Sequence, residues 1–215
     1  MSTWGIVVAG GAGSRFGTAK QFESIAGARL VDRAVETATG ACDEVVVVVP
    51  EGFAWDGAPV SAAVVGGASR SASVRAGLAE VPTSASILVV HDAARPLATP
   101  ALFDAVIRAV RSGADAAVPA LPVSDTVKRV DGDRVVETVA RDGLVAVQTP
   151  QAFRADRLRA AHATGADASD DAALIEAGGG QVVIVPGEAA NLKVTTPADL
   201  AAATALVAGA SWERS

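Results

Sequence analysis

The chain has 215 residues, of which 50% are hydrophobic and 20% charged, and a chain of this length buries roughly 70% of its unfolded surface on folding. We therefore expect a single domain over residues 1–210, followed by a loose tail over 211–215. The net charge of −6 and the lack of a Lys/Arg-rich run argue against nucleic-acid partners. No apolar run reaches the ~20 residues of a membrane span. The single cysteine, Cys42, cannot form an intrachain disulfide, so we expect a cytoplasmic protein with no membrane contact.

Short apolar runs alternate with helical patterns along the chain. Runs rich in β-branched residues predict strands at 5–9, 45–49, 87–90, 116–118 and 182–185. Apolar residues at helical spacing, several with Pro near the first turn and Gly near the end, predict helices at 30–39, 71–80, 100–112, 170–178 and 197–208. Strands without polar alternation are typical of a parallel sheet that is covered on both faces. The pattern predicts a doubly wound, mostly parallel α/β fold with right-handed crossovers.

One segment departs from this alternation of strands and helices. Residues 124–140 alternate around Asp131-Gly132-Asp133, which predicts a β-hairpin with a three-residue link. We expect an arm at about 122–145, inserted into the α/β core. Because a lone hairpin is marginally stable in water, the arm should pack on something, such as another subunit.

A glycine-rich turn follows the first predicted strand. The sequence Ala9-Gly-Gly-Ala-Gly-Ser-Arg-Phe-Gly17 leads to Lys20, and backbone N–H groups in such a turn can close around phosphate oxygens. A plain tight turn and a dinucleotide fingerprint are the alternatives. Two features argue against an NAD-binding turn. It carries two cations, Arg15 and Lys20, and the next predicted strand does not end in an acidic residue about 20 residues later that could bind the ribose. A Walker loop is excluded because no Gly-Lys-Ser/Thr follows. We favour a triphosphate-binding loop.

A carboxylate at the end of a central strand is the second landmark. Asp92 follows the run 87–90 and would face the same crevice as the glycine loop, where Mg²⁺ bridging phosphates needs an oxygen ligand. A turn or helix-cap aspartate is the alternative. We expect His91 to support the strand end and His162, in a helix rich in Arg and Ala, to be solvated. Lys193 alone indicates only a loop lysine.

Several motifs in order resemble the 2-C-methyl-D-erythritol 4-phosphate cytidylyltransferase family over nearly the whole chain. They are Ala9 to Arg15 with Lys20-Gln21, Gly66-Gly67 with Arg70 and Ser73-Val74, His91 to Pro96, Asp125-Thr-Val-Lys128, Arg141-Asp-Gly-Leu144, Gln148-Thr-Pro-Gln151 and Asn191-Leu-Lys-Val-Thr195. The sequence departs from the family at Ala19, Ala68, Ser169 and Ala190, which affects details of the site but not the reaction class.

The resemblance implies a Rossmann-like nucleotidyltransferase fold and Mg²⁺-dependent transfer of CMP from CTP to methylerythritol phosphate, a polyol phosphate, releasing pyrophosphate. It implies a homodimer with shared active sites, in which the arm reaches a neighbouring subunit's site. It assigns catalysis to Arg15, Lys20 and Lys193, and metal binding to Asp92. The implied nucleotide-binding residues are Ala9, Gly10, Gly11, Ala12, Gly13, Gly66, Gly67, Ser73, Asp92, Ala93 and Arg95. The implied residues for the polyol phosphate are Thr126, Arg141, Thr149, Ser169 and Lys193.

Three alternatives stay open. A ribitol 5-phosphate cytidylyltransferase shares the fold and most of the motifs. A non-catalytic nucleotide-binding module would keep the glycine turn but would not need all of Arg15, Lys20, Asp92 and Lys193. A dinucleotide-dependent oxidoreductase would need an acid after the second strand. Only three of the 18 basic residues are lysines, and two of them, Lys20 and Lys193, fall in the predicted phosphate site.

Overall fold

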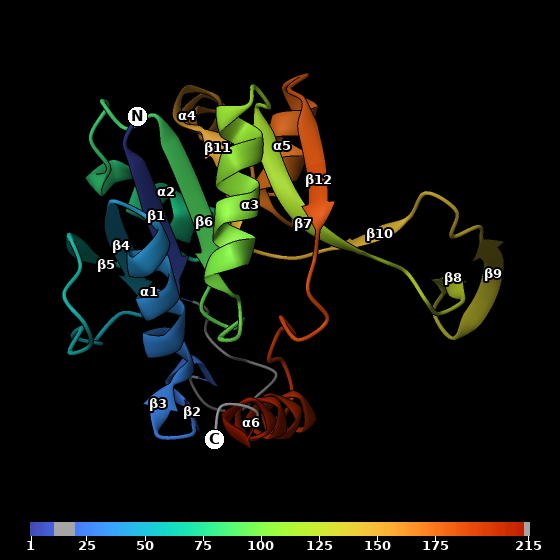
Figure 1. Cartoon of the computed structure of the whole chain (residues 1–215). Coiled ribbons are helices and arrows are strands. Elements are labelled where there is room, and N and C mark those ends of the chain that lie inside the picture. Colours follow the sequence, from blue (N-terminus) through green and yellow to red (C-terminus); the bar gives the residue numbers. More distant parts are fainter. Residues whose placement is uncertain (11–19, 213–215) are drawn as a thin grey trace.

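A computed structural model describes residues 1–10 and 20–212. Within these residues an eight-stranded mixed sheet forms the centre of the molecule (Figure 1). Its strands are β1 (Thr3–Val8), β4 (Glu44–Val49), β5 (Ala62–Val65), β6 (Ile87–Asp92), β7 (Ala116–Pro122), β10 (Val145–Val147), β11 (Gln151–Arg154) and β12 (Val182–Pro186). Strands β6, β1, β4 and β5 are parallel neighbours, and β12 is parallel to β7. The short strands β10 and β11 run antiparallel to their partners.

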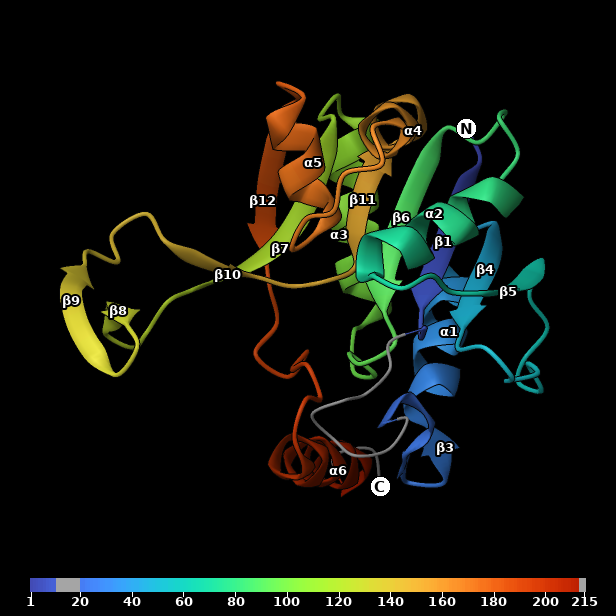
Figure 2. The same ribbon diagram turned by 180° about the vertical axis from the view of Figure 1, so that it is seen from behind.

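Helices cover both faces of this sheet. On one face α1 (Leu30–Ala41) and α3 (Pro100–Arg111) pack on the strands, and on the other α2 (Arg70–Glu80), α4 (Ala155–Ala163) and α5 (Asp171–Ala177) do so (Figures 1 and 2). Alternate valines of β4 enter the two separate cores, because successive side chains of a strand point to opposite faces. This double coverage explains why the strands read as unbroken apolar runs.

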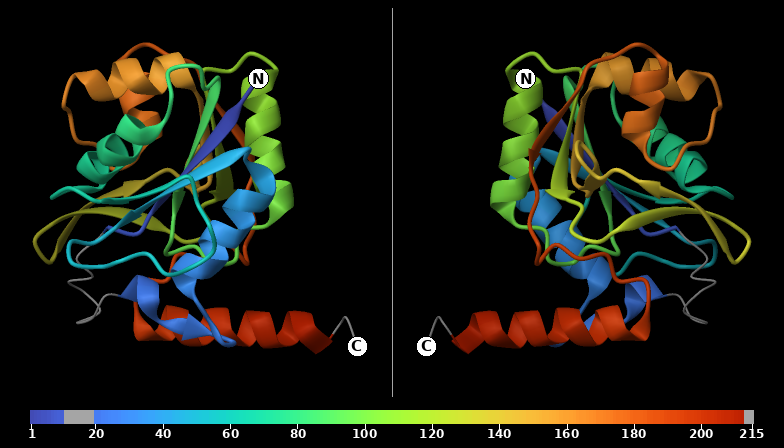
Figure 3. Two further views of the ribbon diagram at one scale, coloured as in Figure 1. Left: turned by 90° about the vertical axis from the view of Figure 1, so that its left-hand side faces the viewer. Right: turned by 90° about the vertical axis from the view of Figure 1, so that its right-hand side faces the viewer.

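A third, smaller core lies apart from the two large ones. It consists of the buried residues Ile25, Leu30, Val194 and Ala203. It joins the small β2 (Ser24–Ile25) and β3 (Ala28–Arg29) hairpin to α6 (Pro197–Trp212), which crosses below the sheet (Figure 3). At the start of α6 the side chains of Thr196 and Asp199 each accept a hydrogen bond from the other's backbone N–H, which forms a capping box.

The predicted hairpin arm is present. It consists of β8 (Val127–Asp131) and β9 (Arg134–Val139), which form a two-stranded sheet of their own and extend away from the main sheet (Figure 1). Asp131 pairs with Arg134, so the turn has two residues rather than the predicted three. Gly132 takes a φ of +59° there, which a residue without Cβ adopts without strain. Apolar side chains of the arm are more than half exposed, namely Val130, Val135 and Val136.

The predicted doubly wound, mostly parallel α/β fold with an inserted hairpin is confirmed, and all five predicted strands and five predicted helices are present. Helix α6 continues through Trp212, and residues 213–215 lie outside the described part, so the loose tail over 211–215 stays a prediction. Among the helices of the described residues, none has the length and apolar character to cross a membrane.

We expect Gly77→Ala to lower the free energy of unfolding by about 1–3 kcal/mol, because overpacking outweighs the better helix propensity of alanine. Helix α2 lies so close to the sheet that a Cβ on Gly77 would be 2.6 Å from Cγ2 of Ile6. Gly40 is the matched control, since a Cβ there has no neighbour within 4 Å. Gly40→Ala should be neutral or stabilise by up to about 1 kcal/mol. Urea unfolding measures both, and equal changes would contradict the close approach.

Candidate active site

The predicted crevice forms where parallel strands end. Ala9 and Gly10 follow β1, Gly66 follows β5, and Asp92 is the last residue of β6. Because β5, β4, β1 and β6 are parallel neighbours, these positions lie along one edge of the sheet. The structure thus brings together the predicted nucleotide residues that it describes at this edge.

Two backbones touch at this edge. A Cβ on Gly10 would lie 3.3 Å from Cα of Gly66, and a Cβ on Gly66 would lie 2.7 Å from Oγ of Ser73. The Ser73 hydroxyl accepts a hydrogen bond from the N–H of Gly67 (3.2 Å) and donates to the carbonyl of Ser69 (3.0 Å). A side chain at either position would press on Ser73 or on the facing backbone, so glycine suits this close approach.

Part of the predicted loop lies outside the described residues, including Gly11, Ala12, Gly13 and Arg15. Lys20 begins the short 3₁₀ helix η1 (Lys20–Phe22), and only its backbone is described. The catalytic roles of Arg15 and Lys20 therefore stay predictions.

Asp92 is buried between two cations. Its Oδ1 lies 3.0 Å from Nε of Arg70 and its Oδ2 lies 2.6 Å from Nζ of Lys193. Burial alone would raise the pKa of Asp92, but the charges of Arg70 and Lys193 outweigh it and hold that pKa well below its usual range. The carboxylate is therefore charged at neutral pH, as a metal ligand must be.

A second buried carboxylate extends this ion-pair network. Nη1 of Arg70 lies 2.7 Å from Oδ2 of Asp171, whose Oδ1 accepts a hydrogen bond from Nε2 of His162 (2.9 Å). The prediction of a solvated His162 is wrong, because this side chain is 4% exposed. The signal was present in the sequence: Ala155, Leu158 and His162 share the inward face of α4.

His91 supports the strand end, as predicted. The Thr149 hydroxyl oxygen accepts a hydrogen bond from the backbone N–H of Asp92 (3.0 Å). The hydroxyl proton of Thr149 is therefore donated to Nδ1 of His91 (3.2 Å). Nε2 of His91 then carries the ring proton and donates to the carbonyl of Arg95 (3.1 Å). Burial lowers the pKa of His91 to about 4, which keeps the ring neutral. The Thr149 hydroxyl thus orients the Asp92 backbone, and its contact with substrate stays a prediction.

Buried polar groups hold the segment that carries Lys193. Asn191, fully buried, donates from Nδ2 to the carbonyl of Thr149 (2.9 Å), and its own carbonyl accepts from Nη1 of Arg95 (2.7 Å). The N–H of Val194 donates to the carbonyl of Ala94 (2.8 Å). These bonds tie the segment to the loop that follows β6, next to the buried Ala93. They place Lys193 opposite Asp92.

The remaining predicted substrate residues lie elsewhere. Thr126 and Arg141 are exposed on or beside the arm, and Arg141 donates a hydrogen bond to the carbonyl of Ser124. Ser169 is exposed just before the start of α5. Within the described part of the chain, no hydrogen bond or ion pair joins these three residues to Asp92 or Lys193.

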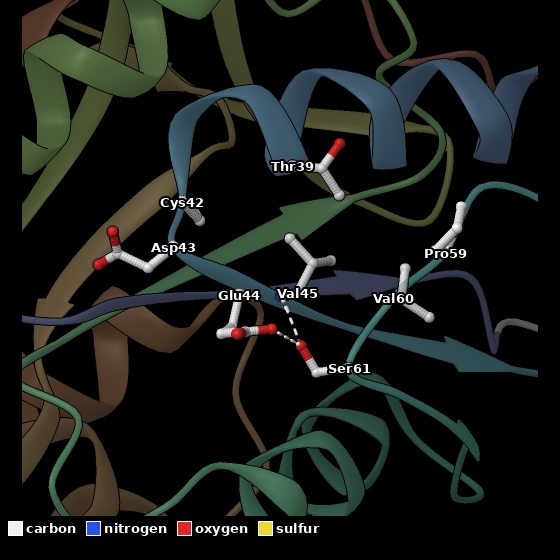
Figure 4. A pocket seen from close by; sticks show the side chains of 8 residues that line it. All are labelled: Thr39, Cys42, Asp43, Glu44, Val45, Pro59, Val60 and Ser61. Atoms are coloured by element: carbon white, nitrogen blue, oxygen red, sulfur yellow. Dashed lines mark hydrogen bonds between the residues drawn. The ribbon is translucent and has the colours of Figure 1, made fainter.

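A pocket of about 350 Å³ is separate from this site (Figure 4). Its lining includes the first residues of β4, at the end of the sheet opposite to Asp92, and none of the predicted site residues. The lining residues are Thr39, Cys42, Asp43, Glu44, Val45, Pro59, Val60 and Ser61.

The fold and the site together define the class of protein. The close approach of Gly10 to Gly66 and the paired carboxylate of Asp92, at the carboxyl ends of parallel strands, are typical of α/β proteins that act on nucleotides. The model of the 2-C-methyl-D-erythritol 4-phosphate cytidylyltransferase family matches residues 4–209, so the chain belongs to this family. The resemblance in the sequence motifs is thereby confirmed.

Curated relatives agree with this assignment. A 2-C-methyl-D-erythritol 4-phosphate cytidylyltransferase of Nocardia farcinica is 45% identical over 94% of this chain and 92% of its own length. A relative from Clavibacter michiganensis named "Bifunctional enzyme IspD/IspF" is also 45% identical, and this chain spans only 54% of its length. The crystal structure of the cytidylyltransferase from Thermus thermophilus superposes with a TM-score of 0.82 at 36% identity, over 94% of this chain and 97% of that one.

The reaction of this family is the CTP-dependent synthesis of 4-diphosphocytidyl-2C-methyl-D-erythritol, a step of the isoprenoid pathway. The chain is thus a cytidylyltransferase, as the sequence motifs predicted. The relatives from Nocardia farcinica and Thermus thermophilus both carry the methylerythritol name.

We expect Lys193→Ala to lower kcat by on the order of 10²-fold if the ammonium acts at the transition state. Lys193→Arg keeps the charge but should also impair turnover, because a planar guanidinium cannot occupy the position of a compact ammonium 2.6 Å from Asp92. Arg108→Lys, at an exposed position of α3, is the control and should leave kcat unchanged. Pyrophosphate release measures all three, and wild-type turnover in Lys193→Arg would show that charge alone suffices.

Proposed function

We propose that this chain transfers CMP from CTP to 2-C-methyl-D-erythritol 4-phosphate in the crevice between the Gly10–Gly66 contact and Asp92. An oxygen of the methylerythritol phosphate forms a bond to the α-phosphorus of CTP, and the bond from that phosphorus to the β-phosphate oxygen breaks. Pyrophosphate leaves with the electron pair. The observation that carries this proposal is the buried Asp92 held between Arg70 and Lys193 beside a crevice lined by backbone.

The nucleophile needs no catalytic base. A phosphate monoester has a second pKa of about 6 and is mostly a dianion at neutral pH. The difficulty is the approach of two anions and the charge that develops on the leaving pyrophosphate. Lys193 suits this task, because its side chain is 41% exposed and Asp92 is its one ionic partner within residues 1–10 and 20–212. Its ammonium can turn from Asp92 toward phosphate oxygens, while Arg15 and Lys20 complete the set of cations.

The nucleoside would bind along the glycine contacts. The backbone groups of Gly66 and Gly67 can read cytosine, whose amino group donates where the carbonyl of uracil accepts. Ser73 supports this turn, because its hydroxyl holds the N–H of Gly67. We propose that Ala9, Gly10, Ala93 and Arg95 shape the adjoining wall for ribose and phosphates.

Asp92 fits the proposed role of Mg²⁺ ligand. Each of its two oxygens accepts a hydrogen bond from one cation, which leaves lone pairs for a metal ion. Mg²⁺ commonly takes one or two protein carboxylates and completes its shell with substrate phosphates and water. When bound, Mg²⁺ would neutralise charge on the triphosphate.

We propose a homodimer in which the arm completes the site of the other subunit. Thr126 and Arg141 lie on or beside an arm that extends away from the main sheet, so they are far better placed for a neighbour's substrate than for their own (Figure 1). The exposed valines of the arm supply an apolar surface for such a contact.

The experiment that tests the reaction is pyrophosphate release from CTP with a panel of acceptors. Methylerythritol 4-phosphate should support turnover with Mg²⁺ and should support little without it. Ribitol 5-phosphate and glycerol phosphate should be much poorer acceptors. Preference for ribitol phosphate would move the chain to the alternative cytidylyltransferase, and CTP binding without any turnover would indicate a non-catalytic nucleotide-binding module.

The dimer has a separate test. We expect Val135→Asp to yield monomers and to lower turnover sharply, because it places a charge on a side chain that is 55% exposed in the apolar surface of the arm. Leu206→Asp, on the exposed face of α6, is the matched control and should stay dimeric. Sedimentation velocity reports the oligomeric state, and a fully active wild-type monomer would refute the shared site.

A further inference from the structure

We propose that Arg70 is a positioning residue for the transfer reaction. It orients the Asp92 carboxylate toward the phosphates, and it is itself held in place by Asp171 and His162. This inference rests on the proposed function of Asp92 as the ligand of Mg²⁺.

Arg70 occupies a position from which it can reach two elements. It is the first residue of α2, directly after the N-cap Ser69, at the end of the helix that faces the crevice. Its Nε donates to Asp92 at the end of β6, and its Nη1 donates to Asp171 in the first turn of α5. One planar guanidinium therefore ties a strand end to a helix on the same face of the sheet.

The two cations at Asp92 differ in what else they contact. The Arg70 side chain is 22% exposed and binds two carboxylates, and its Nη2 is buried without a partner among the described residues. Lys193 is more exposed, and among the described residues its ionic partner is Asp92 alone. Arg70 is thus fixed by the protein, whereas Lys193 is free to turn to a ligand. Arg70 sets the direction of Oδ1 of Asp92. Oδ2 of Asp92 becomes available to the metal ion when Lys193 turns to a ligand.

Asp171 is well suited to hold Arg70 in this orientation. It is fully buried, and its two oxygens are divided between Nη1 of Arg70 and Nε2 of His162. The neighbouring Asp170 fixes the start of α5, because it caps Ala173 (3.1 Å) and accepts from Nε2 of Gln151 (2.8 Å). Without the charge of Asp171, the guanidinium would lose one of its two anchors and the Asp92 carboxylate would be free to rotate.

The test compares Arg70→Lys and Asp171→Asn with a matched ion pair on neighbouring elements. Arg70→Lys keeps the charge but cannot bridge two carboxylates, and Asp171→Asn keeps an oxygen for His162 while it removes the charge. Arg75 lies one turn further along α2 and pairs with the exposed Asp167 (3.2 Å), so Arg75→Lys and Asp167→Asn are the controls. Thermal unfolding, kcat and the KM for each substrate are measured for all four variants.

Calorimetry provides a readout that does not depend on activity. CTP binding is measured with and without Mg²⁺, and the ratio of the two affinities reports how well the protein presents its metal ligand. In Arg70→Lys and Asp171→Asn we expect this ratio and kcat each to fall roughly tenfold or more, in the range found when partners of metal ligands are removed. The KM for methylerythritol phosphate should change less than twofold, and the controls should match the wild type.

One outcome would overturn the inference. Either variant could melt at a lower temperature and yet, when assayed well below its melting point, keep the wild-type kcat and the wild-type ratio of CTP affinities with and without Mg²⁺. In that case Arg70 only stabilises the fold through its ion pairs. If Arg70→Lys fails to fold, Asp171→Asn and His162→Gln decide the question, because Asp171 holds Arg70 directly and His162 acts on it through Asp171. Failure of the proposed function looks different: Asp92→Asn would then retain the wild-type Mg²⁺ effect.

Discussion

The structure depends on the cost of burying one charge. Asp92 ends a central strand where burial disfavours a free carboxylate, and a buried charge is tolerated only when it is paired and hydrogen-bonded. Each of the two cations that pair with it needs its own support. Helix α2 supplies Arg70, and the segment after Asn191 supplies Lys193. The third core and the bonds of Asn191 hold that segment, and Thr149 with His91 fixes the strand end itself. Much of the polar interior thus serves a single carboxylate.

The division between rigid and exposed groups explains the chemistry that the site can perform. The glycine contacts exclude side chains and leave backbone groups along the crevice, while the charged groups lie at its other wall. An enzyme that joins two phosphates must offer positive charge that stabilises the transition state more than it stabilises the bound substrates. Here a fixed arginine and a more exposed lysine share one anion. The acidic net charge of the chain is no obstacle, because Arg70 and Lys193 concentrate positive charge at Asp92, in the proposed phosphate site.

The sequence predicts most of the parallel strands and the hairpin arm, but not the short antiparallel strands β10 and β11. Runs such as 45–49 and 87–90 are strands because both of their faces are buried, which leaves a continuous apolar signal. Strands β10 and β11 have three and four residues, and Gln151-Ala-Phe-Arg154 carries neither alternation nor β-branching, so their pairing with β7 depends on tertiary contacts. In the site, motifs identified Asp92 and Lys193. The role of Arg70 could not be predicted, because it depends on Asp171, which is 101 residues away in sequence and adjacent only after folding. The burial of His162 could have been predicted from its position on the apolar face of α4.

The separation of the paired residues along the chain has a consequence for the order of folding. Arg70 and Asp92 lie in the first half of the chain, whereas Asp171 and Lys193, which complete their ion pairs, lie 101 residues beyond Arg70 and Asp92 respectively. During synthesis from the N-terminus, β1, β4 and β6 emerge with the Asp92 charge only half compensated. Long-range pairings of this kind form late, because the chain entropy of closing a long loop is lost before the contact forms. A nascent chain can therefore build its sheet early, but the crevice reaches its final electrostatic state only after residue 193 has been added.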